Sequence, residues 1–504
     1  MEILLVNPPH PAIGSRIPKE QLPPLGLLCI GGTLLDAGYE VTLLDGEVGC
    51  LSQETIVENV VTHQPQILII GHSGSTSAHP IVTELTSKFR SVLPQLTIIY
   101  GGVFPTYHFH DILIEESQID VIVRGEGEAT LPKLVKALEN DTNLETVEGI
   151  AFRCQDQVKV TPPAPMIQNL DAYRVGWELI DFSQYSYYGG KRAVVMQFSR
   201  GCPHLCNYCG QRGFWARWRH RNPQQFAQEI AWLHHTHGVE LINLADENPT
   251  VNKQVWRELC EAIIAQDISI TIIGSTRADD IVRDADILHL YRQAGIERFL
   301  LGMENTDEAT LQKIRKGSTT PTDREAIRLL RKHGILSLVT WVTDFEEVRD
   351  RDFVQGLRQL LSYDPDQVMS LYVTPHRWTG YYRLASNRRV IQLDQRKWDY
   401  KHQVLATRYL PPWRIFLWVK LIEIILQGRP KSIWRAFFQN DRASRWGMNW
   451  FTRMGRRVLV HECWHFFWRD RRVKNGPTLE EFWGLPQDHQ EIPLKITNSK
   501  FPSH

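Results

Sequence analysis

Short apolar runs alternate with amphipathic helical stretches from the N-terminus to about residue 140. Five of these runs have the length and composition of buried strands: EILLVN, EVTLLD, QILIIG, TIIYGG and IDVIVRG. Helix candidates such as LGLLCIGGTLLDAG and HPIVTELTSKFRSVL lie between them. Strands that alternate with crossover helices predict an α/β fold with a doubly wound parallel sheet. In such sheets ligands bind at the carboxyl ends of the strands.

A second alternation of strands and helices begins at Ala193. Its strand candidates are AVVMQFS, VELINLA, SITIIGS, IERFLLGM, ILSLVTWV and DQVMSLYV. Six strand–helix units predict an open or partial (β/α)6 barrel, whose functional residues lie on loops at the carboxyl ends of the strands. Between the two arrays, EGIAFRCQDQVKVT predicts a hairpin within an irregular connection.

The pattern changes again near Thr374, after which no strand alternation remains. Ten of the sixteen tryptophans lie in this last part, from Trp378 to Trp483. We predict a mainly helical C-terminal domain. The chain is therefore expected to comprise a Rossmann-like domain, a linker, a partial barrel and a helical domain, with boundaries at 1–145, 146–190, 191–375 and 376–504.

Composition narrows the classes of function. Lys plus Arg and Asp plus Glu both number 57, so the net charge indicates no nucleic-acid partner. The start, MEILLVNPP, is typical of a first strand and not of a signal peptide. The most apolar late stretch, WRIFLWVKLIEIIL, is short and contains Lys420 and Glu423, which predicts no transmembrane segment. We expect a cytoplasmic protein and leave open a peripheral contact of this amphipathic stretch with a membrane.

Three of the eight cysteines fall within eight residues, directly after the first strand of the second array. Cys202, Cys206 and Cys209 have the spacing Cys-x3-Cys-x2-Cys in the string SRGCPHLCNYCGQRGFW. Iron–sulfur clusters are held by thiolates, and three thiolates leave one iron of a cuboidal cluster with an open position. The alternatives are plain structural cysteines and a zinc site completed by His204 or His220, although no second Cys-x2-Cys exists to supply a pair of zinc ligands.

This motif, in this place, resembles that of the radical S-adenosylmethionine (SAM) superfamily. The resemblance implies that a [4Fe–4S] cluster sits on Cys202, Cys206 and Cys209, that its open iron chelates SAM, and that Tyr208 lies beside the adenine. Polar residues at the ends of the next strands are the other candidate SAM contacts, and each could instead cap the following helix. These candidates are Asp246, Glu247, Ser275, Arg277 and Glu304.

The first array in turn resembles the cobalamin-binding domain that precedes many radical SAM domains. The strings LPPLGLLCIGGTLLDAGYEVTLLD, IIYGGVFPTYHFHDIL and DVIVRGEGEATLPKL carry the resemblance. It implies that cobalamin lies against the turns after the third and fourth strands, at Ser73, Ser75, Gly101 and Gly102. The string Asp-x-His-x-x-Gly is absent, so no histidine is expected as the lower ligand.

Within that family the chain resembles a group of oxidative cyclases that act without O2 on magnesium-protoporphyrin IX monomethyl ester. The strings are GGVFPTYHFHDIL, CGQRGFWARWRHRNP, LADENPT, LYVTPHRWTG, RKWDYKHQVL and HECWHFFWRDRR. The resemblance implies a tetrapyrrole substrate, a new oxygen taken from water and a low-potential electron donor of the flavodoxin or ferredoxin type. Arg377, His461 and His465 are the candidate substrate contacts.

Three alternatives remain at this point. A cobalamin-dependent radical SAM methyltransferase would share every motif named above. A non-catalytic cobalamin or tetrapyrrole sensor would not need an iron with an open position. HECWH also matches the H-E-x-x-H motif of zinc peptidases, with Glu462 as base, but that interpretation leaves the three-cysteine motif and both strand–helix arrays unexplained.

Overall fold

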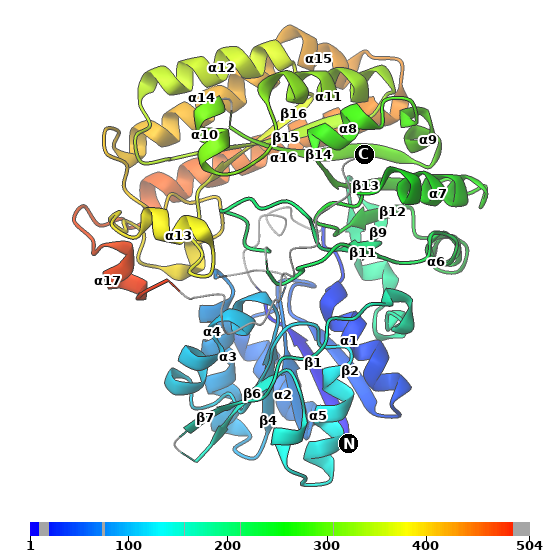
Figure 1. Cartoon of the computed structure of the whole chain (residues 1–504), viewed down its shortest axis with the longest axis vertical. Helices are drawn as coiled ribbons and strands as arrows, with labels where there is room; N and C mark the ends of the chain where they lie inside the picture. The colour runs from blue at the N-terminus through cyan, green and yellow to red at the C-terminus, as the bar shows by residue number, and fades with distance from the viewer. Residues whose placement is uncertain (10–19, 73–75, 156, 212, 306, 487–504) are drawn as a thin grey trace, which may run out of the picture.

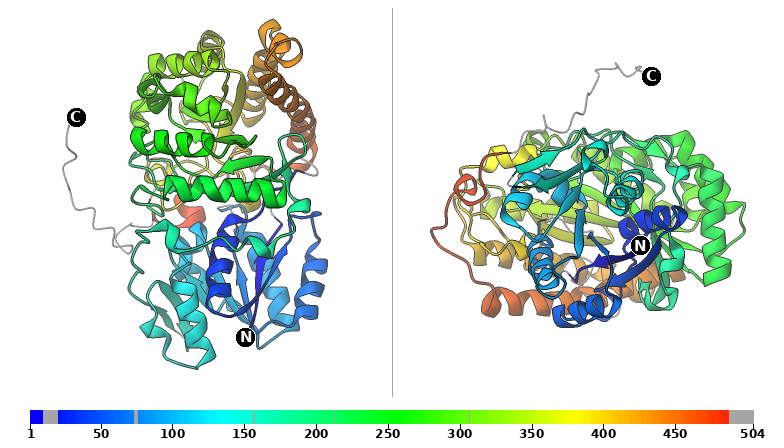
Figure 2. Two further views of the ribbon diagram at one scale, coloured as in Figure 1. Left: turned by 90° about the vertical axis from the view of Figure 1, so that its right-hand side faces the viewer. Right: turned by 90° about the horizontal axis from the view of Figure 1, so that it is seen from below.

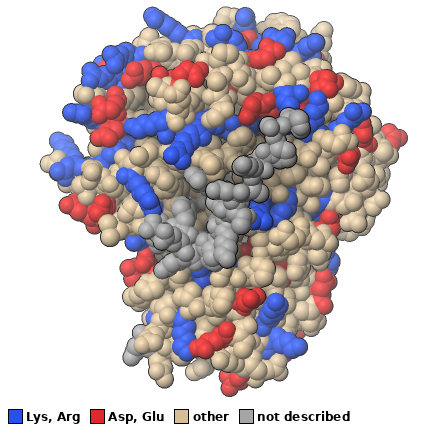
Figure 3. All heavy atoms as spheres, in the orientation of Figure 1, with Lys and Arg blue, Asp and Glu red and all other residues tan. Residues whose placement is uncertain are grey.

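The computed structural model describes residues 1–9, 20–72, 76–155, 157–211, 213–305 and 307–486. Two lobes are stacked on each other (Figure 1), with the N-terminal sheet, blue to cyan, below a larger sheet drawn in green to yellow. Side chains of both charges are interspersed on the face drawn in Figure 3, as the balanced composition leads one to expect.

The first lobe is the doubly wound sheet that the apolar runs predict, with strand order β2-β1-β3-β4-β5-β6-β7. The first five strands are parallel, and β6 and β7 form the predicted antiparallel hairpin. The strands are β1 (Glu2–Asn7), β2 (Glu40–Asp45), β3 (Ile67–Ile70), β4 (Thr97–Gly101), β5 (Val121–Val123), β6 (Ile150–Cys154) and β7 (Gln157–Val160). The helices are α1 (Leu25–Asp36), α2 (Gln53–His63), α3 (His79–Val92), α4 (Val103–Glu115) and α5 (Thr130–Glu139).

Alternation along β1 explains why its run is apolar throughout. Leu4 and Val6 belong to the hydrophobic cluster on one face of the sheet, while Ile3 and Leu5 belong to the cluster on the other. A strand covered by helices on both faces needs apolar residues at every position. The strand order places the topological switch between β1 and β3, which is where such sheets bind ligands.

The second lobe is the predicted partial barrel. Its sheet has the order β16-β15-β14-β13-β12-β9-β8, in which six parallel strands are flanked by the antiparallel β8. The order has two free ends, so the barrel is open. The strands are β8 (Ser186–Tyr187), β9 (Lys191–Met196), β12 (Leu241–Leu244), β13 (Thr271–Thr276), β14 (Ile296–Glu304), β15 (Leu336–Thr343) and β16 (Gln367–Tyr372).

Helices on the convex side connect these strands: α6 (Pro223–His237), α7 (Lys253–Ile264), α8 (Ala278–Arg283), α9 (Leu288–Gln293), α10 (Glu308–Lys313), α11 (Thr320–Lys332) and α12 (Asp350–Tyr363). A short antiparallel ribbon, β10 (Ser199–Arg200) with β11 (Arg219–His220), brackets the three-cysteine loop. The link between the lobes is largely irregular, with 3₁₀ turns at Leu170–Ala172, Trp177–Leu179 and Phe182–Gln184.

The described C-terminal part is mainly helical between residues 412 and 469, whereas residues 386–411, which fall in the predicted helical domain, are largely irregular. The helices of this part pack directly on the barrel. They are α13 (Gly380–Ala385), α14 (Pro412–Gly428), α15 (Pro430–Phe437), α16 (Arg442–Trp464) and α17 (Leu479–Trp483), with a π-helical turn at His465–Arg469. Ile415 and Val419 of α14 share one hydrophobic cluster with the barrel helices. Trp450 and Phe451 of α16 cover Ala193, Leu241 and Leu338 on the sheet's other face.

We propose the boundaries 1–145, 146–190, 191–375 and 376–504 as divisions along the chain. The structure modifies them in two places: β6 and β7, within the second segment, belong to the first sheet, and the last unit shares the core of the barrel. The left view of Figure 2 shows α15 and α16, in orange to red, along one edge of the molecule. Within the ranges that the structure describes, no helix combines the length and the apolar character needed to cross a bilayer.

Candidate active site

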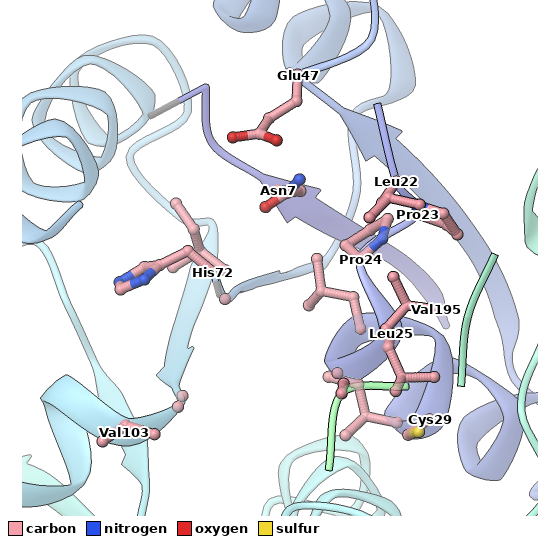
Figure 4. Close-up of a pocket in the computed structure, with 18 of the residues that line it drawn as sticks. Asn7, Leu22, Pro23, Pro24, Leu25, Cys29, Glu47, His72, Val103 and Val195 are labelled. Carbon is pink, nitrogen blue, oxygen red and sulfur yellow. The ribbon is translucent and has the colours of Figure 1, made fainter. Parts of the chain in front are cut away.

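A cavity of about 1210 Å³ lies where the two lobes meet. Its lower wall is formed by the carboxyl ends of the first sheet, including Asn7, His72 and Gly102, and its upper wall by Val195 and Asn243 of the barrel strands. Figure 4 shows Asn7, His72 and Val103 on one side of the space, facing Leu22–Leu25 and Val195 on the other. Both strand arrays thus direct their ligand-binding ends into one space, as the rules for each fold require.

The predicted cobalamin side of this cavity is partly described. Gly101 and Gly102 both line it, at the end of β4 and before α4. Gly102 has φ +118°, a backbone conformation that favours glycine, and the lack of a side chain leaves the wall flat. Ser73 and Ser75 lie outside the described residues.

Among the described residues of the first lobe, His72 is the histidine that reaches the cavity. His72 lines it, and its Nε2 lies 2.8 Å from the Tyr100 hydroxyl. His79, which is half-buried, and His108, which is buried, lie on either side of Phe104, with ring centroids 4.5 and 4.3 Å from that ring. Burial lowers the pKa of His79 to about 3, so this imidazole is neutral.

The three cysteines lie on the loop that follows β10. Gln211, Phe214 and Trp215 of this loop line the barrel side of the cavity, whereas the cysteines themselves lie behind the lining residues. Cys206 is buried, and Cys202 and Cys209 are half-buried. Burial raises the pKa of the Cys202 thiol to about 11, while nearby Arg277 acts to lower it and the other two thiols act to raise it. The spacing Cys-x3-Cys-x2-Cys places the three thiols on one loop, beside a fixed cation that favours thiolates. This donor set fits a [4Fe–4S] cluster held by three thiolates.

Two carboxylates after β12 hold the start of this loop. Asp246 Oδ1 accepts hydrogen bonds from the Ser199 backbone N–H and hydroxyl, at 2.5 and 2.6 Å, and Oδ2 accepts one from the Phe198 N–H at 3.0 Å. Glu247 accepts one from the Gly201 N–H at 3.1 Å and also lines the cavity. Burial raises the pKa of Asp246 to about 6 and that of Glu247 to about 7.

Both acids remain predicted SAM contacts. Asp246 directs both oxygens at the loop, which indicates a positioning role, whereas Glu247 also faces the cavity.

The far side of the loop is fixed by backbone contacts. The Asn207 N–H donates to the Ile314 carbonyl at 3.1 Å, and the Asn207 carbonyl accepts from the Tyr381 N–H at 2.8 Å. The Trp378 indole N–H donates to the Gly210 carbonyl at 2.8 Å. Barrel and C-terminal segment therefore both hold the loop, which preorganises the thiols.

Four of the predicted SAM-binding residues lie on the cysteine loop or at the ends of β13 and β14. The Arg277 guanidinium bonds to Asp279 at 2.9 Å and to the Lys316 carbonyl at 3.0 Å. Glu304 ends β14 with φ +64° and lies 3.5 Å from Lys316 Nζ. Tyr208 is hydrogen-bonded to Glu304, and burial raises the pKa of its hydroxyl. Ser275 lies near the end of the neighbouring strand β13. This cluster combines a cation and a carboxylate beside the cysteines, which suits the zwitterionic end of SAM.

Gly201 provides a test of the loop. Its φ is +95°, and a Cβ at this position would collide with the Arg217 carbonyl. We expect Gly201→Ala to cost about 1–3 kcal/mol in backbone strain and to lower the iron content of the reconstituted protein severalfold. Iron and sulfide analysis measures the loss. Gly428→Ala is the matched control, because a Cβ there would meet nothing within 4 Å. Equal iron in both variants would contradict this account of the loop.

An ion-pair network that the sequence analysis missed joins the loop to the cobalamin side. Arg200 bonds to Glu126 at 2.8 Å and to Glu128 at 2.5 Å, and Arg219 bonds to Glu126 at 2.9 Å. All four side chains are largely buried. Arg200 also lies over the Trp215 ring, 4.8 Å from its centroid. The string RGEGE after the fifth strand could have indicated this network, because two acids at the end of a buried strand need cationic partners.

The predicted substrate residues have different surroundings. His461 and His465 line the cavity, one helical turn apart, with ring centroids 4.1 Å apart. Burial lowers the pKa of His465, and His461 beside it adds to the effect. Arg377 instead forms an ion pair with Asp111 at 2.5 Å and donates to the Leu485 carbonyl. Among the described residues of the C-terminal part, the Arg and Lys side chains that line the cavity with His461 and His465 are Arg396 and Lys397.

Glu462 is not available as the base of a zinc peptidase. It is buried on α16 and forms an ion pair with Lys420 of α14. Within the described part of the chain, no group of three or more His, Cys, Asp or Glu side chains is placed to hold a single metal ion.

Comparison with known proteins agrees with this geometry. Residues 17–135 match the B12 binding domain, and residues 196–355 match the Radical SAM superfamily. The solved radical SAM methyltransferase TsrM from Kitasatospora setae has a TM-score of 0.69 at 15% identity, covering 92% of this chain and 98% of that one. The cobalamin-dependent radical SAM enzyme OxsB has a TM-score of 0.65 at 18% identity, covering 91% and 71%. These likenesses show the fold.

The chain is thus a cobalamin-binding radical SAM protein, a class whose cofactors are a [4Fe–4S] cluster, SAM and cobalamin. It is 76% identical to an anaerobic magnesium-protoporphyrin IX monomethyl ester cyclase from Synechocystis sp., over 99% of this chain and all of that protein. A cyclase of the same name from Cereibacter sphaeroides is 32% identical, over 75% of this chain and 63% of that one. The chain belongs to this cyclase family.

Proposed function

We propose that this protein catalyses the oxidative cyclisation of magnesium-protoporphyrin IX monomethyl ester, forming the isocyclic ring of protochlorophyllide with an oxygen atom from water. The observation that carries the proposal is the 76% identity to the Synechocystis cyclase along the whole chain. The cavity supports it, because one space of about 1210 Å³ is bordered by the cobalamin side, the cluster loop and a pair of histidines. Ligand pockets for ordinary small molecules are about 300–1,000 Å³.

The cavity and the cysteine loop beside it have separate tasks in this proposal. Cys202, Cys206 and Cys209 would hold the cluster, and Arg277 and Glu304 would orient SAM on it. When bound, these cofactors supply a radical that abstracts hydrogen from the substrate, and cobalamin supplies a one-electron acceptor. The apolar segment Leu22–Leu25 excludes water from one side of the cavity.

The histidine wall is the proposed substrate side. His461 and His465 present imidazoles that could bind the substrate's magnesium, and Arg396 and Lys397 could pair with its free carboxylate. Like Arg377 with Asp111, both cations already have carboxylate partners, Asp394 for Arg396 and Asp470 for Lys397, which a substrate carboxylate would have to displace. We further propose a cytoplasmic protein that receives electrons from a low-potential flavodoxin or ferredoxin.

The decisive experiment uses water labelled with ¹⁸O. The reconstituted protein is incubated without O2 with SAM, cobalamin, a reductant and magnesium-protoporphyrin IX monomethyl ester. We expect the keto oxygen of the product to carry the solvent label, and 5′-deoxyadenosine to form in step with the product. Mass spectrometry measures both.

Two other outcomes discriminate the alternatives. A methylated porphyrin with S-adenosylhomocysteine and no incorporated oxygen would replace the proposal with a methyltransferase, the activity named for the structural relative TsrM. A protein that binds its cofactors but cleaves no SAM would indicate a sensor.

A further inference from the structure

The helices α14 and α16 lie antiparallel and side by side. The Phe416 and Phe466 rings are stacked with centroids 4.1 Å apart, and Lys420 pairs with Glu462. At the other end, a Cβ on Gly455 would touch Gln427. The contact positions rise along α14 while they fall along α16, which shows that the two helices are antiparallel. The solvent-facing residues of one helix therefore lie beside those of the other.

Both helices expose apolar side chains with the same spacing. On α14 these are Leu417, Leu421 and Ile424, and on α16 and the turn after it they are Val460, Trp464 and Phe467. Each set follows the i, i+4, i+7 pattern of one helix face. Trp468 extends the second set by stacking on Trp464, with ring centroids 5.0 Å apart, although it is 67% exposed. We call these seven residues the C-terminal apolar face. Contiguous exposed apolar surface of this kind marks a site of interaction.

The exposed charged side chains next to the C-terminal apolar face on α16 are cationic. Between residues 442 and 474 there are nine Arg or Lys residues and two acids. The two acids are both satisfied internally, Glu462 by Lys420 and Asp470 by Lys397 at 2.5 Å. Arg453, Arg456 and Arg457 precede Val460 on α16 and are exposed, and none of the three has a carboxylate partner among the described residues.

We propose that the C-terminal apolar face docks the protein on the surface of a bilayer that contains anionic lipids. Tryptophan is enriched where one side of a ring meets hydrocarbon and the other meets headgroups. Arginines beside an apolar helix face add attraction to anionic headgroups, and a helix of this kind lies in the plane of the interface. Neither helix needs to cross the bilayer, which agrees with the absence of a spanning helix in the described ranges.

If the protein has the proposed function, docking through this face would bring the bilayer close to the substrate side of the cavity. His461 and His465, which line the cavity, are on the same helical turns as Trp464 and Trp468. A bilayer bound to the apolar face would therefore lie next to the histidine side of the cavity. An apolar macrocycle could then pass from the lipid phase to the site with little exposure to water.

Flotation with vesicles tests the docking itself, independently of any turnover. The reconstituted holoenzyme is mixed with vesicles of phosphatidylcholine, with or without phosphatidylglycerol. We expect binding to the anionic vesicles only, and weaker binding at high salt. The variant Arg453→Gln/Arg456→Gln/Arg457→Gln should bind roughly 100-fold more weakly. Trp464→Ser/Trp468→Ser should lose binding at every salt concentration.

The control variant is Ile114→Ser/Arg351→Gln, which changes an exposed apolar side chain and an exposed arginine elsewhere and should bind like the unmodified protein. Circular dichroism checks that each variant is folded. Equal binding of all variants, or no binding to anionic vesicles, would overturn the proposal. A dimer that Trp464→Ser/Trp468→Ser converts to a monomer would also overturn it, because the face would then bind a second copy.

Discussion

Replacement of Cys206 by alanine is expected to abolish both the cluster and the cleavage of SAM. Cys206 is the buried member of the three, and its loop is held on both sides, by Glu247 through Gly201 and by Ile314 and Tyr381 through Asn207. A rigid loop cannot move another donor into the place of a missing thiolate. Two thiolates do not hold a cuboidal cluster, so iron content and the charge-transfer absorbance should fall to background. Cys202→Ala and Cys209→Ala should behave alike.

Cys154→Ala is the matched control, because Cys154 is a half-buried cysteine on β6 of the other lobe. It should keep full iron content and full production of 5′-deoxyadenosine. Absorbance and electron paramagnetic resonance of the reconstituted variants measure the cluster directly. An intact [4Fe–4S] spectrum in Cys206→Ala would refute the assignment of these ligands.

The strands were predictable because burial on both faces leaves a strong signal. EILLVN and EVTLLD coincide with β1 and β2 residue for residue, and all six barrel strands appear where apolar runs predict them. The assignment of the three cysteines as cluster ligands stays a prediction, and it rests on their spacing along the chain. Neither prediction needed knowledge of which segments meet in space.

Side-chain direction was not predictable in the same way. An acid at a strand end can face a ligand or turn back to a neighbouring loop, and Asp246 does the second with both oxygens. Arg377 stays a predicted substrate contact, but its ion pair with Asp111, more than 200 positions earlier in the chain, was not predictable. The tryptophans after residue 376 divide similarly. Trp378 and Trp398 are fully buried, whereas Trp464 and Trp468 are exposed, and composition alone does not separate these groups.

Arg200→Ala should separate the two halves of the site without removing a ligand of the cluster. Arg200 comes two residues before Cys202 and pairs with Glu126 and Glu128, which follow β5 on the cobalamin side. It is therefore a positioning residue that fixes one cofactor wall relative to the other. Its loss leaves two buried carboxylates with only Arg219 as a cation, and breaking a buried ion pair in this way costs about 3–5 kcal/mol.

Activity should fall further than cofactor binding. A displacement of about 1 Å between reacting groups can cost about 100-fold in rate. We expect Arg200→Ala to keep its [4Fe–4S] spectrum and to cleave SAM, but to form product about 100-fold more slowly, so that 5′-deoxyadenosine exceeds product. Thermal unfolding reports the lost stability, and the ratio of 5′-deoxyadenosine to product reports the lost alignment.

Arg174→Ala is the matched control for this experiment. Arg174 also joins two carboxylates, Asp36 at 2.7 Å and Glu178 at 2.7 Å, and it too connects α1 of the first lobe to a later segment. The side chains of Arg174, Asp36 and Glu178 are each more than 40% exposed. Solvent therefore screens both ion pairs, and the loss of each pair costs about 0–1 kcal/mol. Its ratio of 5′-deoxyadenosine to product should therefore stay unchanged. If Arg200→Ala behaved like Arg174→Ala in both measurements, the buried network would not be what aligns the cluster loop with the cobalamin side of the cavity.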